Sequence, residues 1–197
     1  MITDSSGSLS IWNRLPLVLG ALLLVGTYFV PLWRIELWAP QYPEGLYLQI
    51  WLTHLTGDVA SINNLNHYIG MKTIHQESFP EFRILPYVVG GLAVLGAGAA
   101  VVARRWAAWT WLIVLVLFLG ASMLDFYLWE YDYGHNLDPK APIKVAGMSY
   151  QPPLIGYKQL LNFEAYSLPD VGAWLIGSAT GLAALAVGLS YWPKNRS

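Results

Sequence analysis

The chain has 197 residues, of which 55% are hydrophobic and 12% are charged, and its formal net charge is −1. Soluble domains carry about 25% charged residues, so this composition favours a membrane protein, and the near-neutral charge argues against nucleic acid as a partner. The chain contains no cysteine, which excludes disulfides, thiolate metal sites and cysteine nucleophiles.

Four apolar runs predict transmembrane helices, because about 20 apolar residues cross a hydrocarbon core of roughly 30 Å. These runs cover residues 15–33, 84–103, 107–129 and 171–192. We therefore predict an all-α integral membrane protein that forms one membrane domain over residues 1–197. The first run lacks an A-x-A-like cleavage site, so we expect it to be retained rather than removed as a signal peptide.

Basic residues near the predicted span ends indicate the orientation. Five of them lie in short segments on the side of both termini: Arg14, Arg104, Arg105, Lys194 and Arg196. The positive-inside rule gives weight to such short segments, so we predict a bacterial inner-membrane protein with both termini in the cytoplasm. Residues 34–83 and 130–170 then form two long loops that cap the extracytoplasmic face.

The first loop carries one strand pattern and one helix pattern. Leu46, Leu48 and Ile50 alternate with less apolar side chains, which predicts a short strand. After Asp58, a good N-cap, the apolar period becomes helical and predicts an amphipathic helix over residues 59–75. The face opposite its apolar residues would carry His67, Met71 and His75.

A thioether between two imidazoles on one helix face favours copper, because soft sulfur ligands prefer Cu(I). His67 and His75 would be about 12 Å apart along a straight helix, so one ion cannot contact both. We therefore predict His67 and Met71 as the core ligands, with His75 and His135 as additions. The alternative is that this face is a polar surface that packs on the second loop.

The second loop offers complementary groups because the third span continues past the predicted membrane as a helix. This extension would place Asp125, Asp132 and His135 on one face. Asp132 could bind a metal beside His135 or orient the His135 ring. Asp125 is the one ionisable residue within a predicted span, and it is either functional or directed toward the nearby interface.

The fourth span contains the small-residue pattern G-x-x-x-G at Gly177 and Gly181. Such a face lets helices approach closely, so we expect it to pack against another helix of this chain or against a partner subunit.

The first loop also resembles a known group of proteins. The pattern consists of Tyr42, Pro43, Gly45 and Leu46, then Gly57 and Asp58, then residues 62–71. It resembles an uncharacterised family of small bacterial membrane proteins associated with copper-dependent respiration, particularly accessory genes around nitrous-oxide reductase. The resemblance implies a periplasmic or membrane copper protein as a partner, and it implies no catalytic role.

The sequence contains no Gly-rich phosphate loop, G-x-S-x-G or HExxH motif. We therefore predict an accessory protein rather than an enzyme, one that binds copper on the extracytoplasmic face and assists maturation or metal supply of a copper respiratory enzyme. One alternative is a structural subunit of a membrane respiratory complex without metal. Another is a quinone- or lipid-handling enzyme that uses Asp125 and His135, which would require an apolar pocket at that interface.

Overall fold

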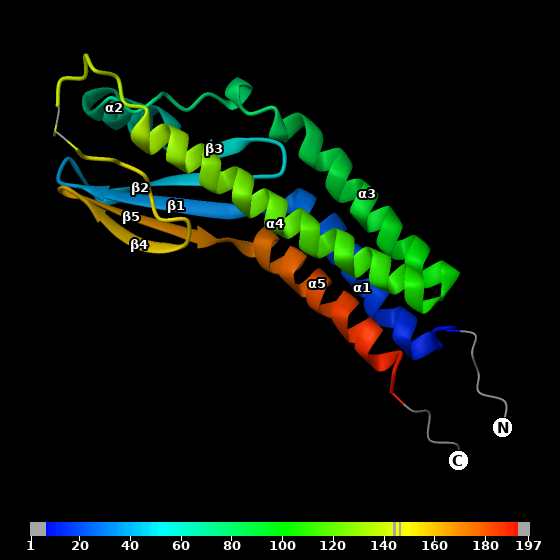
Figure 1. Cartoon of the computed structure of the whole chain (residues 1–197). Helices are drawn as coiled ribbons and strands as arrows, with labels where there is room; N and C mark the ends of the chain where they lie inside the picture. Colours follow the sequence, from blue (N-terminus) through cyan, green and yellow to red (C-terminus); the bar gives the residue numbers. More distant parts are fainter. Residues whose placement is uncertain (1–6, 144, 146, 193–197) are drawn as a thin grey trace, which may run out of the picture.

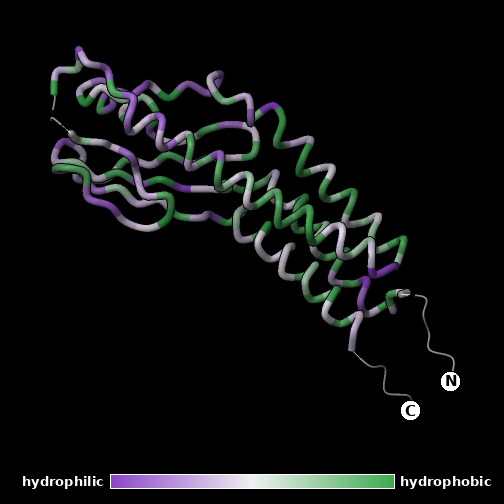
Figure 2. Tube along the Cα trace, in the orientation of Figure 1, coloured by the Kyte–Doolittle hydropathy of each residue, from purple (hydrophilic) through white to green (hydrophobic). Residues whose placement is uncertain are grey.

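The computed structural model describes residues 7–143, 145 and 147–192, which form a four-helix bundle joined end-on to an antiparallel sheet (Figure 1). Each bundle helix is long and apolar enough to cross a membrane, the first of them together with the short turn that continues it to Phe29. These helices are α1 (Ile11–Gly26), α3 (Glu81–Val102), α4 (Arg105–His135) and α5 (Val171–Leu189). Figure 2 shows that hydrophobic residues dominate the bundle, whereas hydrophilic residues concentrate around the sheet.

The prediction of an all-α protein is wrong, because the two predicted loops together build a five-stranded sheet with strand order β3-β2-β1-β5-β4. The strands are β1 (Trp33–Ala39), β2 (Tyr42–Ile50), β3 (Leu55–Gly57), β4 (Gly156–Leu160) and β5 (Phe163–Pro169). All neighbouring strands are antiparallel. The strand predicted from Leu46 to Ile50 lies within β2, whereas the other four strands were not predicted.

The sheet continues the bundle because two neighbouring inner strands, β1 and β5, are direct extensions of two packed helices. A short 3-10 helix, η1 (Thr27–Phe29), leads from α1 to β1, and β5 runs into α5. Asp170 caps α5 by accepting a hydrogen bond from the Val171 backbone N–H at 2.7 Å. Since β1 pairs with β5, with Trp33 opposite Pro169, the sheet is held in line with the bundle.

Helix α2 (Val59–Ile69) and the last turns of α4 cover one face of the sheet and enclose a second apolar core. This core contains Ile35, Leu48, Ile62, Ile74 and Tyr133. A helix of 31 residues is about 46 Å long, which exceeds the hydrocarbon thickness of roughly 30 Å, so α4 can both span a membrane and reach the sheet.

The predicted helix over residues 59–75 is present but ends six residues early, at Ile69. Gly70 has a φ of +80°, a left-handed conformation that terminates the helix and that glycine adopts at low cost. The chain after Gly70 therefore leaves the helical path, and residues 71 and 75 no longer share a helix face with residue 67.

The bundle core is built from small residues around one large ring. Trp111 is fully buried, and its Nε1–H donates to the Leu92 carbonyl oxygen at 2.9 Å. Helix α5 packs inward with its alanines, including the fully buried Ala179, Ala183 and Ala186. Gly177 and Gly181 are exposed and have open space around them, so their packing against a partner helix stays a prediction.

The helix ends away from the sheet come together at one end of the bundle. The Leu9 backbone N–H donates to the Ala103 carbonyl oxygen at 2.7 Å, which ties the segment before α1 to the turn between α3 and α4. The start of α1 and the end of α5 therefore lie on the same side, opposite the sheet (Figure 1).

Candidate functional site

The structure separates His67 from Met71, the two predicted core ligands for copper. His67 lies on α2, is exposed, and has its ring centroid 6.0 Å from that of Tyr68. Met71 follows Gly70, packs against the core beneath α2 and lines a cavity there. The two side chains therefore have different environments, one in solvent and one against apolar groups.

Of the other predicted ligands, His75 is exposed, and His135 and Asp132 contact other side chains. His75 is exposed just before a short 3-10 helix, η2 (Gln76–Ser78), and exposed His135 stacks on Tyr131 with ring centroids 4.0 Å apart. Asp132 forms an ion pair with Lys72, and hydrogen bonds from Lys72 and Asn136 hold the pKa of this carboxyl below its usual value.

Among the described residues, no three His, Asp or Glu side chains come together as a metal site would require. Asp132 and His135 are both on α4, as predicted, but the Nδ1 atom of His135 is in hydrogen-bond contact with the Tyr131 carbonyl oxygen, which accepts, rather than with Asp132. The predicted set thus does not converge on one ion, and copper binding stays a prediction.

A large apolar cavity lies where the bundle meets the sheet, and we call it the junction cavity. Its volume is about 390 Å³, within the range of about 300–1,000 Å³ found for small-molecule sites. Phe118 and Leu119 of α4 line its bundle side, and Ile50 of β2 lines its sheet side. The cavity therefore extends from the apolar helices to the sheet.

The polar groups of the junction cavity are few. Besides the indole N–H groups of Trp33 and Trp129, they comprise the carboxylates of Glu81 and Asp125 and the hydroxyls of Ser78 and Ser122. Asp125 and Ser78 are exposed, and Glu81 and Ser122 are half-buried. Asp125 was singled out from the sequence, and the structure places it on the wall of an apolar cavity, whereas His135 does not line this cavity.

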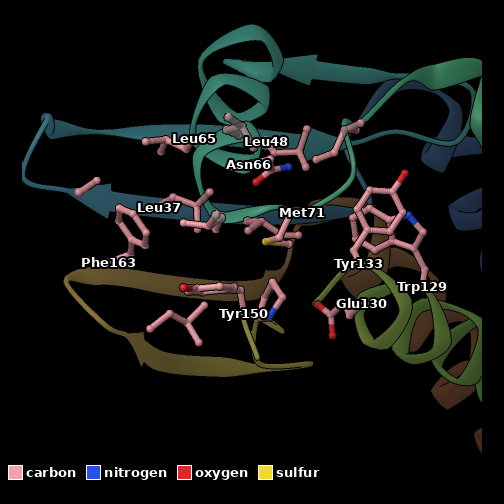
Figure 3. Close-up of a pocket in the computed structure, with 17 residues that line it drawn as sticks. Leu37, Leu48, Leu65, Asn66, Met71, Trp129, Glu130, Tyr133, Tyr150 and Phe163 are labelled. Carbon is pink, nitrogen blue, oxygen red and sulfur yellow. The ribbon is translucent and has the colours of Figure 1, made fainter. Parts of the chain in front are cut away.

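A second, smaller cavity of about 70 Å³ lies between the sheet and α2, and we call it the sheet cavity (Figure 3). Met71, Tyr133 and Tyr150 line it together with apolar residues of β1 and β2. Glu130 also lines it and is fully buried. In Figure 3 its carboxyl projects from α4 toward the side on which Met71 and Tyr150 lie.

Glu130 has no hydrogen-bond partner for either carboxyl oxygen among the described residues. It lies just beyond the predicted membrane span, next to the sheet. Burial raises its pKa to about 8, and the positive charge of Lys158 opposes this shift only partly. The acid therefore exists largely in its neutral form near pH 7.

The sequence analysis missed Glu130. The one feature of the sequence that could have indicated Glu130 is its position next to Trp129, one residue past a predicted span. A glutamate is common at a membrane interface, so this position did not mark it as functional. Comparison with protein-family models, with curated proteins and with solved structures finds no match.

Proposed function

We propose that this chain is a multi-pass membrane protein that binds a hydrocarbon-tailed amphiphile of the bilayer, a lipid or a quinone, in the junction cavity. The observation that carries this proposal is the apolar volume of about 390 Å³ between the helix bundle and the sheet. Pockets for small molecules commonly form between structural units, with mainly apolar walls and a few polar groups that orient the ligand.

The position of the junction cavity supports an amphiphile rather than a water-soluble ligand. Phe118 and Leu119 lie in the apolar part of α4. A hydrocarbon tail that binds there leaves the apolar interior of the bilayer for an apolar protein surface. The sheet end reaches Ile50, beyond the helices. A tail can therefore enter from the outer half of the membrane without crossing a polar layer.

The few polar groups of the cavity suit the polar end of such a molecule. Glu81 begins α3 at the end that faces the sheet, whereas Ser122 and Asp125 lie inside α4, several turns before its end at His135. With the termini in the cytoplasm, as proposed from the basic residues, these groups lie at the extracytoplasmic interface. The proposal concerns binding of the molecule and assigns no chemical step.

The test is to purify the full chain in a mild detergent and to identify bound small molecules by native mass spectrometry and by solvent extraction. Ser122→Trp places a large ring in the junction cavity, whereas the matched Ala121→Trp adds the same ring at an exposed neighbour that does not line it. We expect the parent and Ala121→Trp to retain a lipid or a quinone and Ser122→Trp to lose it.

Equal retention by the parent chain and both variants would show that the bound molecule is bulk lipid at the protein surface and would overturn the proposal. The mass of the retained molecule distinguishes a lipid from a quinone, because the two classes release different head groups on fragmentation.

A further inference from the structure

The junction cavity and the sheet cavity share one wall. Leu48, Ile74 and Trp129 line both cavities, so the two spaces are neighbours that meet at these residues. Glu130 is the neighbour of Trp129 in α4 and lies on the sheet-cavity side of this wall. A molecule in the junction cavity thus contacts residues that also border the cavity of the buried carboxyl.

The carboxyl of Glu130 needs an explanation, because burying a polar group without a hydrogen bond carries an energetic cost. Both of its oxygens lack partners among the described residues. The hydroxyl of Tyr150 also lacks one, but it points away from Glu130 in Figure 3, so the two groups do not satisfy each other. A bound ligand that hydrogen-bonds Glu130 would remove this cost.

The size and charge of the sheet cavity restrict the group that can enter it. Its volume of about 70 Å³ is roughly half of the 150 Å³ that holds a benzene molecule, which is too small for a phosphate with its glycerol. No basic residue is among the described side chains that line it. An anionic headgroup would therefore lose its hydration without gaining a counter-ion at the wall.

We infer that the amphiphile of the proposed function ends in a compact, uncharged, oxygen-bearing group, a hydroxyl, a carbonyl or a protonated carboxyl, which passes Trp129 and hydrogen-bonds Glu130 while the tail fills the junction cavity. This inference rests on the proposed function and narrows its ligand class to single-ended molecules such as fatty alcohols or fatty acids. It excludes phospholipids.

The chemistry of a neutral carboxyl fits such a ligand. Its O–H donates to a carbonyl oxygen, and its C=O accepts from a hydroxyl. The raised pKa of Glu130 keeps the O–H present near neutral pH. The aromatic side chains Trp129 and Tyr133 supply a flat apolar wall beside the acid, which suits the first carbons next to the oxygen.

The experiment measures equilibrium binding of radiolabelled hexadecanol to the full chain in detergent, with unlabelled hexadecanol and phosphatidylcholine as competitors. Glu130→Leu removes the hydrogen bond, and we expect binding to weaken roughly threefold to tenfold, the effect of one lost hydrogen bond. Glu130→Gln keeps a donor and an acceptor and should stay within about twofold of the parent. Phosphatidylcholine should not displace the alcohol.

Unaltered binding by Glu130→Leu, together with loss of binding by Ser122→Trp, would overturn the inference and leave the proposed function standing. Displacement by phosphatidylcholine as effective as by hexadecanol would overturn the ligand class. Failure of the parent chain to bind hexadecanol would overturn the inference, and retention of another lipid by the same preparation would still support the proposed function. Melting temperature controls for folding, since Glu130→Leu removes an unpaired buried group and should not destabilise the protein.

Discussion

The indole ring of Trp111 lies directly over Gly96, so closely that a Cβ atom built at residue 96 would be 2.5 Å from Cζ2 of the ring. Gly20 of α1 faces the same ring, with a corresponding distance of 2.7 Å to Cη2. The ring cannot easily move, because it is fully buried and its Nε1–H is bonded to the Leu92 carbonyl. Two glycines on separate helices thus make room for one tryptophan.

Gly96→Ala should therefore destabilise the bundle by about 1–3 kcal/mol, the usual cost of overpacking a tight core. This cost should outweigh the gain in helix propensity of about 1 kcal/mol. Gly98→Ala on the same helix is the control, because nothing lies within 4 Å of its added Cβ. Thermal unfolding in detergent should show a lower midpoint for Gly96→Ala only; equal midpoints would contradict the packing around Trp111.

Replacement of Gly134 by alanine should also disturb the fold, in this case beside the sheet cavity. A Cβ at this position would be 2.4 Å from the backbone N and Cα of Gln151, and the Gly134 carbonyl accepts from the Tyr150 N–H at 2.9 Å. Gly134→Ala should push the segment around Tyr150 off α4 and raise hydrogen exchange at the Tyr150 amide. Gly120→Ala, which has open space on the same helix, should leave that exchange unchanged.

Glu130 predicts a specific pH dependence of stability. Its pKa in the folded chain is about 8 against an ordinary 4.5, so the folded state keeps a proton that the unfolded state has lost. The contribution to stability is thus complete below about pH 4.5 and is lost as the pH rises through 8, by roughly 1 kcal/mol per pH unit between these values. The other charged group acting on Glu130 is Lys158, which opposes this trend.

Glu130→Gln cannot titrate and should show a flatter melting temperature between pH 5 and pH 8 than the parent. The same slope in both proteins would mean that Glu130 is solvated or paired in the folded chain.

The positions of residues 104 and 140 provide a test of orientation. Arg104 lies in the turn between α3 and α4, and Lys140 lies at the sheet end, past α4. Because the chain contains no cysteine, Arg104→Cys and Lys140→Cys each introduce a single reactive thiol. A membrane-impermeant maleimide applied to spheroplasts should label Lys140→Cys and not Arg104→Cys. The reverse pattern would invert the proposed topology, and labelling of both would contradict a spanning bundle.

Copper binding can be tested at Met71. If Met71 were a ligand, Met71→Leu would weaken Cu(I) binding strongly while hardly changing stability, since the two side chains have similar volume. Met71 packs in the core away from exposed His67, so we expect Met71→Leu to leave the Cu(I) affinity of the chain unchanged. A competition titration with a Cu(I) chelator measures this affinity. A tenfold weaker Cu(I) affinity of Met71→Leu would support His67 and Met71 as a pair of copper ligands.

The sequence alone determined the four helices that are long and apolar enough to span a membrane, because an apolar run in hydrocarbon must satisfy its backbone hydrogen bonds internally and so becomes a helix. Local patterns also predicted the start of α2 after Asp58 and the strand from Leu46 to Ile50. These features depend on residues close together in the chain, which is why composition and periodicity suffice to predict them.

Only the tertiary structure decided the sheet and the site. Strand β1 pairs with β5, more than a hundred residues later, and the β4–β5 turn carries Leu161 at a φ of +58° instead of a glycine signal. The burial of Glu130 likewise depends on β1, β2, α2 and the segment at Tyr150 meeting around α4. A buried glutamate and an exposed glutamate are the same residue in the sequence. Only long-range packing makes their chemistry different.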